Sequence, residues 1–430
     1  MELTRRRLIQ TGLLTGAGLA ANACGGGSSG KGADSLAGQK MAVWVWDGCI
    51  SMNVLKDGVA HFGQTKLTPS VIGGTFKQKL LTTMTSRAFL PSITGVKGED
   101  MPFFKGTKAD QFVDLNTLGA DKISSQYVAW KLKQATTKDG KLLGLPIDIG
   151  PCALFYRQDI FAKAGLPTEP KDVSAAMSTW DGYFDAGVKL KKAVPDSYLI
   201  DDGSSPFAYT VKQGTKLFID ENNHFIADQP HIRTAWDRAI KAMQLGIVAP
   251  YAEPGTTDSN AAYNNGTAAS SVGAAWHYLD LVQAAPKTKG KWRVATMPGG
   301  PANFGGSFLS IPAGGGDHAL AFEVITWLLN PQNEARTWVD NGNFPAAPAS
   351  YSLPELTAPV PFFGGQKTIE IFAPAADKIP VAYEAPGDAA VSTPFLSELK
   401  EVWAKKKDPE KAWNDAVSTA KQVAQREGVS

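Results

Sequence analysis

Cysteine and histidine are scarce in this chain of 430 residues, which contains three cysteines and five histidines. The histidines are scattered along the sequence, so a metal site built from clustered imidazoles is not expected. Motifs of several enzyme sites are also missing: no Gly-Lys pair is followed by Ser or Thr, as in a phosphate-binding loop, and His-Glu-x-x-His does not occur. We therefore expect no cofactor and no bound metal ion.

An excess of charge of one sign is also lacking, because 43 Lys and Arg residues are balanced by 41 Asp and Glu residues. Such a balance creates no global field that would attract nucleic acid or a strongly acidic ligand. Beyond the N-terminal segment there is no apolar run of the roughly 20 residues that span a bilayer. The expected binding partner is neutral overall, and nucleic acid is not among the expected partners.

The N-terminal segment has the features of an export signal. A basic stretch, Thr4–Gln10, precedes small and apolar residues, Leu13–Ala21, and Ala21-Asn22-Ala23 offers small residues for cleavage. Residues 1–23 are therefore predicted to be a signal peptide, because the run is too short and too rich in glycine for an uncleaved membrane helix. The paired arginines resemble a twin-arginine signal, and a Sec signal tolerates them as well.

Cys24 follows the small residues directly, an arrangement that resembles a lipobox with Ala21 where leucine is usual. The resemblance implies that Cys24 is lipidated and becomes the first residue of the mature protein. Residues 24–38 are rich in glycine and serine, which is typical of a flexible tether; about 13 such residues span roughly 20 Å on average. We expect an exported protein held by a lipid on the outer face of the cell membrane.

Length and composition predict two domains, because 430 residues with 43% hydrophobic content exceed what one core usually organises. The first predicted strand, Met41–Trp46, is apolar throughout, which suits a parallel sheet covered on both faces. Ligands bind beyond the carboxyl ends of such strands. Trp46 and Asp47 are therefore candidate ligand contacts, whereas Trp44 fits ordinary core packing.

The stretch Gly140–Pro167 is predicted to connect the two domains. Ile147–Pro151 contains glycine and proline that interrupt a continuous strand, so it is interpreted as a hinge. After it, Ala153–Tyr156 has the short, apolar and aromatic character of a strand. A helix is predicted to begin at Asp159 and to end at Gly165.

Motifs spread over nearly the whole mature chain resemble the family 1 extracellular solute-binding proteins, the sugar-capturing lipoproteins of bacterial ABC importers, of which maltose-binding protein is one type. In family order these motifs are Asp139–Pro146, Leu154–Arg157, Asp159–Pro167, Ser178–Asp181, Tyr263–Ala269 with Gly273 and Trp276, and Gly305–Pro312. Each motif is weak by itself, and their common order carries the resemblance.

The resemblance implies an α/β fold of the periplasmic-binding-protein type II, with two domains that are each a mainly parallel sheet flanked by helices. Domain 1 is expected over 39–147 and 306–345, and domain 2 over 150–298 and 349–428. Three hinge crossings are expected near 147–151, 298–306 and 344–349. Domains joined in this way move as rigid bodies about the hinge when a ligand binds.

Helix ends are marked by capping residues in the C-terminal half. Asp317 is predicted to cap one helix, and Pro331 and Gly342 are predicted to begin and end the next. Two further helices are expected between Pro394 and Gly428, each with proline at its first position, Pro394 and Pro409. The apolar stripes of these two helices are expected to pack against domain 2.

Candidate ligand contacts come from both domains. Trp276 offers a flat apolar face that can stack on a pyranose ring, with buried packing as the alternative. Glu99 and Asp100 lie in a loop where relatives carry acidic contacts; paired carboxylates can accept hydrogen bonds from sugar hydroxyls, and a solvated loop is the alternative. A nearby departure is Ser92, where the family has aspartate. The predicted ligand contacts are Trp46, Asp47, Glu99, Asp100, Asp148, Trp276, Tyr278, Phe304, Gly306, Tyr383 and Glu384.

Once Cys24 is assigned to lipidation, Cys49 and Cys152 remain. An exported protein keeps paired thiols as disulfides, so a Cys49–Cys152 bond is one prediction, and two separate buried thiols are the alternative.

The expected function is capture of a sugar, a di- or oligosaccharide, in a cleft between the domains by a monomer that delivers it to the permease subunits of an ABC transporter. The protein is not expected to be an enzyme. Two alternatives stay open: a ligand of the polyol or glycerol-phosphate type, and an exported carbohydrate-active enzyme, because a glycosidase needs only two carboxylates at a suitable separation.

Overall fold

The computed structural model describes residues 40–63, 66–250 and 255–430. The predicted signal peptide, residues 1–23, the tether, residues 24–38, and the lipidation site at Cys24 lie outside the described residues.

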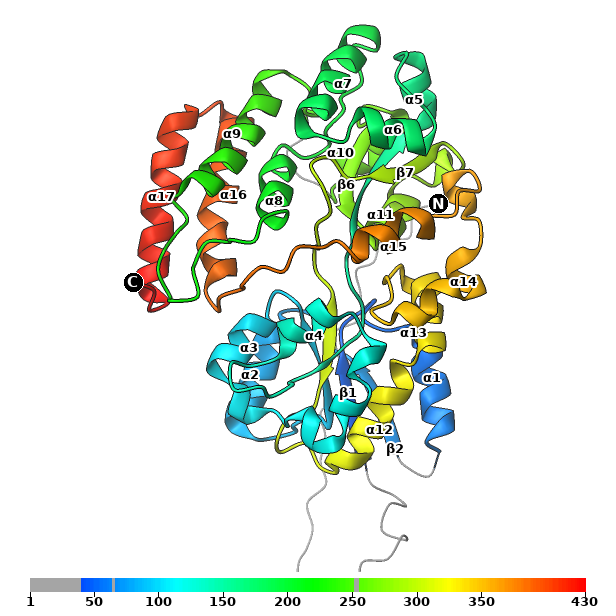
Figure 1. The fold of residues 1–430 in the computed structure, drawn as a ribbon, viewed down its shortest axis with the longest axis vertical. Helices are drawn as coiled ribbons and strands as arrows, with labels where there is room; N and C mark the ends of the chain where they lie inside the picture. The colour runs from blue at the N-terminus through cyan, green and yellow to red at the C-terminus, as the bar shows by residue number, and fades with distance from the viewer. Residues whose placement is uncertain (1–39, 64–65, 251–254) are drawn as a thin grey trace, which may run out of the picture. The chain divides into compact units, whose positions relative to one another are not determined.

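The first lobe is built on a five-stranded sheet in the order β2-β1-β3-β8-β4 (Figure 1). Its strands are β1 (Lys40–Val45), β2 (Lys66–Val71), β3 (Ile93–Lys97), β4 (Leu145–Pro146) and β8 (Ser307–Ser310). The strand β1 runs parallel to β2 and β3, whereas β8 runs antiparallel to β3 and β4. A strand from far along the chain thus completes the sheet between β3 and β4.

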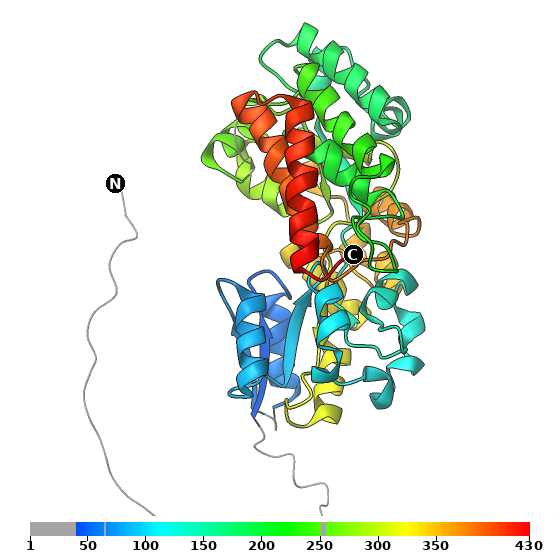
Figure 2. The ribbon, with the colours of Figure 1, turned by 90° about the vertical axis from the view of Figure 1, so that its left-hand side faces the viewer.

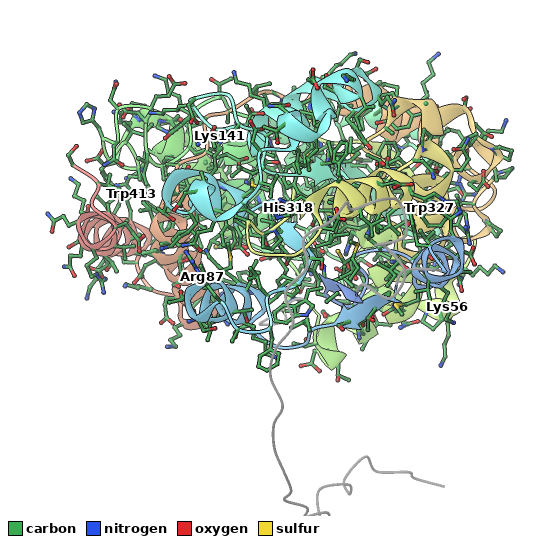
Figure 3. All side chains as sticks on the ribbon, turned by 90° about the horizontal axis from the view of Figure 1, so that it is seen from below. Lys56, Arg87, Lys141, His318, Trp327 and Trp413 are labelled. Atoms are coloured by element: carbon green, nitrogen blue, oxygen red, sulfur yellow. The ribbon has the colours of Figure 1, made fainter. Side chains whose placement is uncertain are left out.

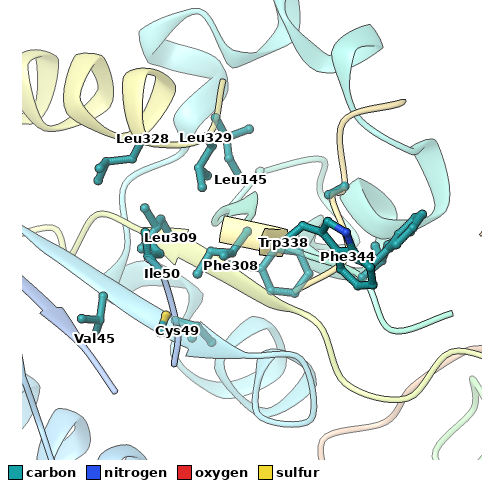
Figure 4. Close-up of a cluster of buried hydrophobic side chains, with 14 of the residues drawn as sticks. Val45, Cys49, Ile50, Leu145, Phe308, Leu309, Leu328, Leu329, Trp338 and Phe344 are labelled. Carbon is teal, nitrogen blue, oxygen red and sulfur yellow. The ribbon is translucent and has the colours of Figure 1, made fainter. Parts of the chain in front are cut away.

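Helices cover the first sheet and enclose its core. They are α1 (Met52–His61), α2 (Phe76–Ser86), α3 (Met101–Thr107), α4 (Ala129–Ala135), α12 (His318–Leu328) and α13 (Pro331–Asn341). Leu145, Phe308 and Leu309 of the sheet are buried together with Leu328 and Trp338 of these helices (Figure 4). Trp327 of α12, labelled in Figure 3, stacks on His61 of α1 with ring centroids 5.0 Å apart.

The second lobe is built on a three-stranded sheet in the order β6-β5-β7. Its strands are β5 (Cys152–Arg157), β6 (Ser270–Ala274) and β7 (Trp292–Thr296), and its helices are α5 (Gln158–Lys163), α6 (Pro170–Ala176), α7 (Trp180–Ala193), α10 (Thr257–Asn265), α11 (His277–Ala284) and α15 (Ile369–Ala376). All six residues of β5 are buried, as its apolar sequence predicts.

The predicted direction of the strands is wrong for much of the protein. Both pairings in the second sheet are antiparallel, and the first sheet mixes two parallel pairings with two antiparallel ones. A continuous apolar run indicates only that both faces of a strand are buried. Because helices can cover both faces of an antiparallel sheet as well, such a run does not determine the direction of the strand.

A separate helical layer completes the second lobe. It contains α8 (Ser205–Lys212), α9 (Pro230–Gln244), α16 (Asp388–Lys405) and α17 (Pro409–Arg426), with the last two side by side in both ribbon views (Figures 1 and 2). Its core is aromatic: Phe207 stacks on Phe395 at 5.9 Å, and Trp236 meets Trp413 edge-on at 5.6 Å. The C-terminal helices therefore pack as their apolar stripes predict.

Most of the predicted helix ends agree with the structure. Asp317 accepts a hydrogen bond from the backbone N–H of Leu320, and Pro331 and Gly342 bound α13. Pro409 begins α17, but Pro394 lies inside α16, which starts at Asp388. The Asp388 carboxylate accepts the backbone N–H groups of Ala385 and Phe218, so tertiary contacts move the start of this helix ahead of its proline.

The remaining short elements link these layers. They are α14 (Pro354–Thr357), which packs on α13, and 3-10 helices at Ala109–Gln111, Leu115–Leu118, Ala120–Lys122, Ser124–Gln126, Pro286–Thr288, Pro348–Ser352 and Pro361–Phe363.

Three chain segments lie side by side where the two lobes meet. The backbone N–H of Ile149 donates to the carbonyl of Phe344 at 2.9 Å, and that of Phe304 donates to the carbonyl of Gly150 at 2.9 Å. The N–H of Cys152 donates to the carbonyl of Ala302, also at 2.9 Å. These bonds hold together the segments for which a hinge role is predicted.

Gly150 makes the closest of these approaches, which leads to a prediction. A Cβ atom at position 150 would lie 2.0 Å from the carbonyl oxygen of Phe304. Gly150→Ala is expected to lower the free energy of unfolding by about 1–3 kcal/mol, because the backbone must shift. Urea unfolding of this variant and of Gly73→Ala, whose added Cβ would meet nothing within 4 Å, measures the difference. Equal stability of the two variants would contradict the prediction.

Candidate functional site

A cleft of about 850 Å³ lies where the two lobes meet. From the first lobe it is lined by the segments that follow β1 and β3, the edge at which a sheet of this kind presents its ligand site. The remaining walls come from α4, α11, the end of α13, the crossing segments, the end of α8 and the segment between α15 and α16. Its lining residues are Trp46–Ile50, Met52, Lys97–Glu99, Gln134, Asp148, Lys212, Trp276, Leu279, Asp280, Gln283, Asn303–Ser307, Asp340, Asn341, Asn343 and Glu384.

Most of the predicted ligand contacts meet in this cleft. Those that line it are Trp46, Asp47, Glu99, Asp148, Trp276, Phe304, Gly306 and Glu384. Three others lie elsewhere: Asp100 forms an ion pair with Lys77 at 3.0 Å, Tyr278 packs on Phe363 at 5.2 Å, and Tyr383 lines a neighbouring groove. Tyr278 is separated from Trp276 because residues two apart at the start of a helix do not share a face.

Aromatic rings stand on both sides of the cleft. From the first lobe, the Trp46 ring meets Phe76 edge-on at 5.2 Å and lies over Gly95, where an added Cβ would come within 2.7 Å of the indole. From the second, the Trp276 Nε1 donates to the carbonyl of Phe304 at 3.3 Å. Both indoles are half-buried and held in place, so each offers part of its apolar surface to the cleft.

A buried lysine lies behind the floor of the cleft. The Lys131 side chain on α4 is 0% exposed, and its Nζ donates to Gln134 Oε1 at 2.7 Å and to the carbonyl of Gly305 at 3.3 Å. Gln134 Nε2 in turn donates to Glu384 Oε2 at 2.7 Å. A hydrogen-bonded chain therefore runs from a crossing segment, through α4, to the segment between α15 and α16.

Asp148 faces the charge of Lys131 on the same floor and is 5% exposed. Burial raises the pKa of Asp148 to about 6, with the attraction of Lys131 acting in the opposite direction. Burial also lowers the pKa of Lys131 to about 8, against the attraction of Asp148 and then of Glu384. Asp148 therefore gains or loses its proton at a pH where Lys131 is charged, and Lys131 does so at a pH where Asp148 is charged.

Two glycines allow the backbone segments at the floor of the cleft to approach each other closely. The backbone N–H of Gly98 donates to the carbonyl of Gly306 at 2.8 Å, and a Cβ at Gly98 would lie 2.3 Å from that oxygen. Gly306 has φ +80°, and its Cβ would lie 2.7 Å from Lys131 Nζ. Gly306 therefore contributes to the cleft through close backbone approach.

The predicted Cys49–Cys152 disulfide is wrong, because both cysteines are free and buried. Cys49 belongs to the hydrophobic cluster of the first lobe (Figure 4), whereas Cys152 belongs to the cluster of the second. Burial raises the pKa of both thiols, so both stay protonated. Export favours pairing of thiols, but only geometry decides it.

Several polar residues of the cleft have no predicted role from the sequence. The Asn303 carboxamide accepts from the N–H of Gly150 at 2.8 Å and donates to the carbonyl of Gly305 at 3.0 Å. Asn343 Nδ2 donates to the carbonyls of Gly48 and Cys49, which fixes the loop after β1. Asn303 could have been predicted from the sequence, because it is the single polar side chain in a segment rich in glycine and proline. The others that line the cleft include Lys97, Gln134 and Lys212.

Two features are absent from the part of the chain that the structure describes. None of its helices combines the length and the apolar character needed to cross a bilayer. Within the same residues, no three or more His, Cys, Asp or Glu side chains are grouped so that they could hold a metal ion.

Two α/β lobes, three adjoining crossing segments and a cleft between them define a binding-protein fold of the periplasmic type II. Residues 78–363 match the sequence model of the family described as bacterial extracellular solute-binding protein, so the chain belongs to that family. The family membership inferred from the motifs is therefore confirmed.

Named relatives and one solved structure extend this result. The chain is 26% identical to the arabinooligosaccharide-binding protein of Bacillus subtilis over 54% of its own length, and spans about half (52%) of that relative. It is 22% identical to the lactose-binding protein of Rhizobium radiobacter, over 84% of this chain and 88% of the relative. A crystal structure described as extracellular solute-binding protein family 1 superposes with a TM-score of 0.84 at 26% identity, covering 90% of this chain and 100% of that one.

Proposed function

We propose that this protein captures a di- or oligosaccharide in the cleft and delivers it to the permease subunits of an ABC importer. The observation that carries the proposal is the pairing of two half-buried indoles, Trp46 and Trp276, with carboxylates and amides in one cleft of about 850 Å³. Pyranose rings have apolar CH faces that stack on indoles and hydroxyls that need polar partners. The names of the relatives, which refer to arabinooligosaccharide and lactose, support this ligand class.

Ligand capture would proceed by closure of the two lobes. Trp46 and Glu99 come from the first lobe, and Trp276 and Lys212 from the second, so a bound sugar contacts both. Such a ligand stabilises the closed arrangement by the difference between its contacts in the closed and open states. The crossing segments near 147–151, 298–306 and 344–349 would act as the hinge, because they carry the chain between the lobes.

The cleft favours a neutral sugar over a phosphorylated ligand. Its charged lining consists of the carboxylates of Asp47, Glu99, Asp148, Asp280, Asp340 and Glu384 and the ammonium groups of Lys97 and Lys212. A phosphate would be repelled by this acidic excess, whereas hydroxyl groups can donate to carboxylates. We further propose that the protein acts as a monomer without enzymatic activity, exported and lipid-anchored through Cys24.

A ligand screen tests the proposal. Residues 25–430 are examined by thermal shift and tryptophan fluorescence with mono-, di- and oligosaccharides, polyols and glycerol phosphates, and each mixture is then analysed by chromatography. A saturable rise in melting temperature with an intact saccharide is expected, because ligand binding stabilises the native state by mass action. Cleavage of the saccharide would identify an enzyme, and a shift only with glycerol phosphates or no shift would reject the sugar.

Trp276 provides a sharper test of the same site. Trp276→Ala is expected to weaken binding of the best saccharide by about 2 kcal/mol, or about 30-fold, because a stacking anchor is removed. Trp327→Ala is the matched control, since its ring packs on His61 away from the cleft. Isothermal titration gives both affinities, and an unchanged affinity in Trp276→Ala would remove the residue from the site.

A further inference from the structure

A second groove adjoins the cleft. Its volume is about 1150 Å³, and it shares the residues Gln134, Lys212, Asn303 and Glu384 with the cleft. Its other walls come from α3, from α4, from the turn after α4, from the segment between α8 and α9 and from the segment between α15 and α16. The two hollows are therefore neighbours across one set of polar side chains.

The hydrogen bond from Gln134 to Glu384 marks the boundary. It joins α4 to the segment between α15 and α16, and Lys131 holds Gln134 from behind at 2.7 Å. Gln134 and Glu384 line both the cleft and the groove. Their amide and carboxylate groups can donate to and accept from sugar hydroxyls. A chain of sugar units leaving the cleft on this side would pass along the pair.

The groove repeats the mixture of rings and polar groups found in the cleft. Trp130 is half-buried, and its Nε1 donates to the carbonyl of Ala376 at 3.3 Å, which fixes the indole. Tyr383 is half-buried on the opposite segment. The polar groups around them include Lys105, Lys133, Thr136, Thr137, Lys138 and Asn222.

The volumes of the cleft and the groove bear on the length of the ligand. The cleft alone, at about 850 Å³, lies within the range of about 300–1,000 Å³ typical of sites for a single small molecule. A ligand that also used the adjoining groove would need further units beyond those in the cleft. The groove would be superfluous for a disaccharide.

We propose that the groove continues the ligand site and that the physiological ligand is an oligosaccharide longer than a disaccharide, whose outer units lie against Trp130 and Tyr383. This inference rests on the proposed sugar-binding function. It adds a chain-length requirement and assigns Trp130, which the sequence does not single out.

The test measures affinity against chain length. Malto-, arabino-, galacto- and chito-oligosaccharides of two to six units are titrated calorimetrically, and the series that binds is followed. The hexasaccharide is expected to bind at least tenfold more tightly than the disaccharide. In Trp130→Ala and in Tyr383→Ala this ratio is expected to fall at least fivefold, whereas Tyr383→Phe, which keeps the ring, and Trp327→Ala, which is remote, are expected to preserve it.

The outcomes separate the two proposals. Equal affinity for the di- and hexasaccharide, or equal losses for both in the groove variants, would overturn the extended site and leave sugar binding intact. Failure of every chain length to bind would overturn the sugar-binding function and the extension with it. Melting temperatures of all variants show whether they fold, and Tyr383→Phe provides the comparison if Tyr383→Ala does not.

Discussion

Replacement of Lys131 by methionine is expected to lower the free energy of unfolding at pH 7 by about 3–5 kcal/mol, because it removes two hydrogen bonds from a charged donor, each worth about 1.5–3 kcal/mol. Lys131 is fully buried, and Asp148 beside it is 5% exposed. Methionine fills a similar volume but leaves Asp148 without the positive charge that attracts it. It also removes the donor to Gln134 and to the carbonyl of Gly305.

Urea unfolding measures this loss, and two controls make it specific. Lys133→Met removes an exposed lysine from the same helix and is expected to change stability by no more than about 0.5 kcal/mol. The double variant Lys131→Met/Asp148→Asn removes both charges and is expected to recover part of the loss. If Lys131→Met were as stable as the parent protein, a stabilising role of Lys131 would be rejected.

Features that depend on neighbouring residues were predictable from the sequence. Asp317, Pro331 and Gly342 bound their helices as capping chemistry requires. Trp46 and Asp47 line the cleft because they follow a strand that lies inside the first sheet. In both cases the controlling interactions lie within a few residues of the predicted position, or follow from a general rule about sheets.

Features that depend on distant residues were not predictable. Lys131 is one of two lysines in a short helix, and nothing nearby distinguishes it from exposed Lys133. Its burial results from Gly305 and Gly306, far away in the sequence, whose backbones come close enough to surround its ammonium group. The direction of the second sheet and the separation of Cys49 from Cys152 also depend on how remote segments meet.

Asp148 is expected to make the stability of the protein fall as the pH rises from about 4 to about 6. Its pKa is raised from 3.8 to about 6 in the folded protein, so in this window the folded state holds a proton that the unfolded state has lost. The stabilisation is complete below the unfolded pKa and is lost as the pH passes the folded one. A difference of about two pKa units corresponds to about 3 kcal/mol.

Comparison with Asp148→Asn isolates this contribution, because the other titrating groups are common to both proteins. The unfolding free energy of the parent minus that of Asp148→Asn is expected to fall by about 2.5 kcal/mol between pH 4 and pH 7, measured by urea unfolding at several pH values. Lys131 stays charged over this window in the parent protein, since its pKa is about 8. A difference that stays constant with pH would show that Asp148 has its ordinary pKa.

The sign of the slope also decides which force dominates at the floor of the cleft. Burial acts to keep Asp148 protonated, whereas the attraction of Lys131 acts to ionise it, and burial is the larger of the two effects. If attraction were the larger effect, the difference between the two proteins would rise with pH. A falling difference means that Asp148 takes up its charge near pH 6, so that below this pH it can donate a hydrogen bond to a sugar hydroxyl and above it can only accept one.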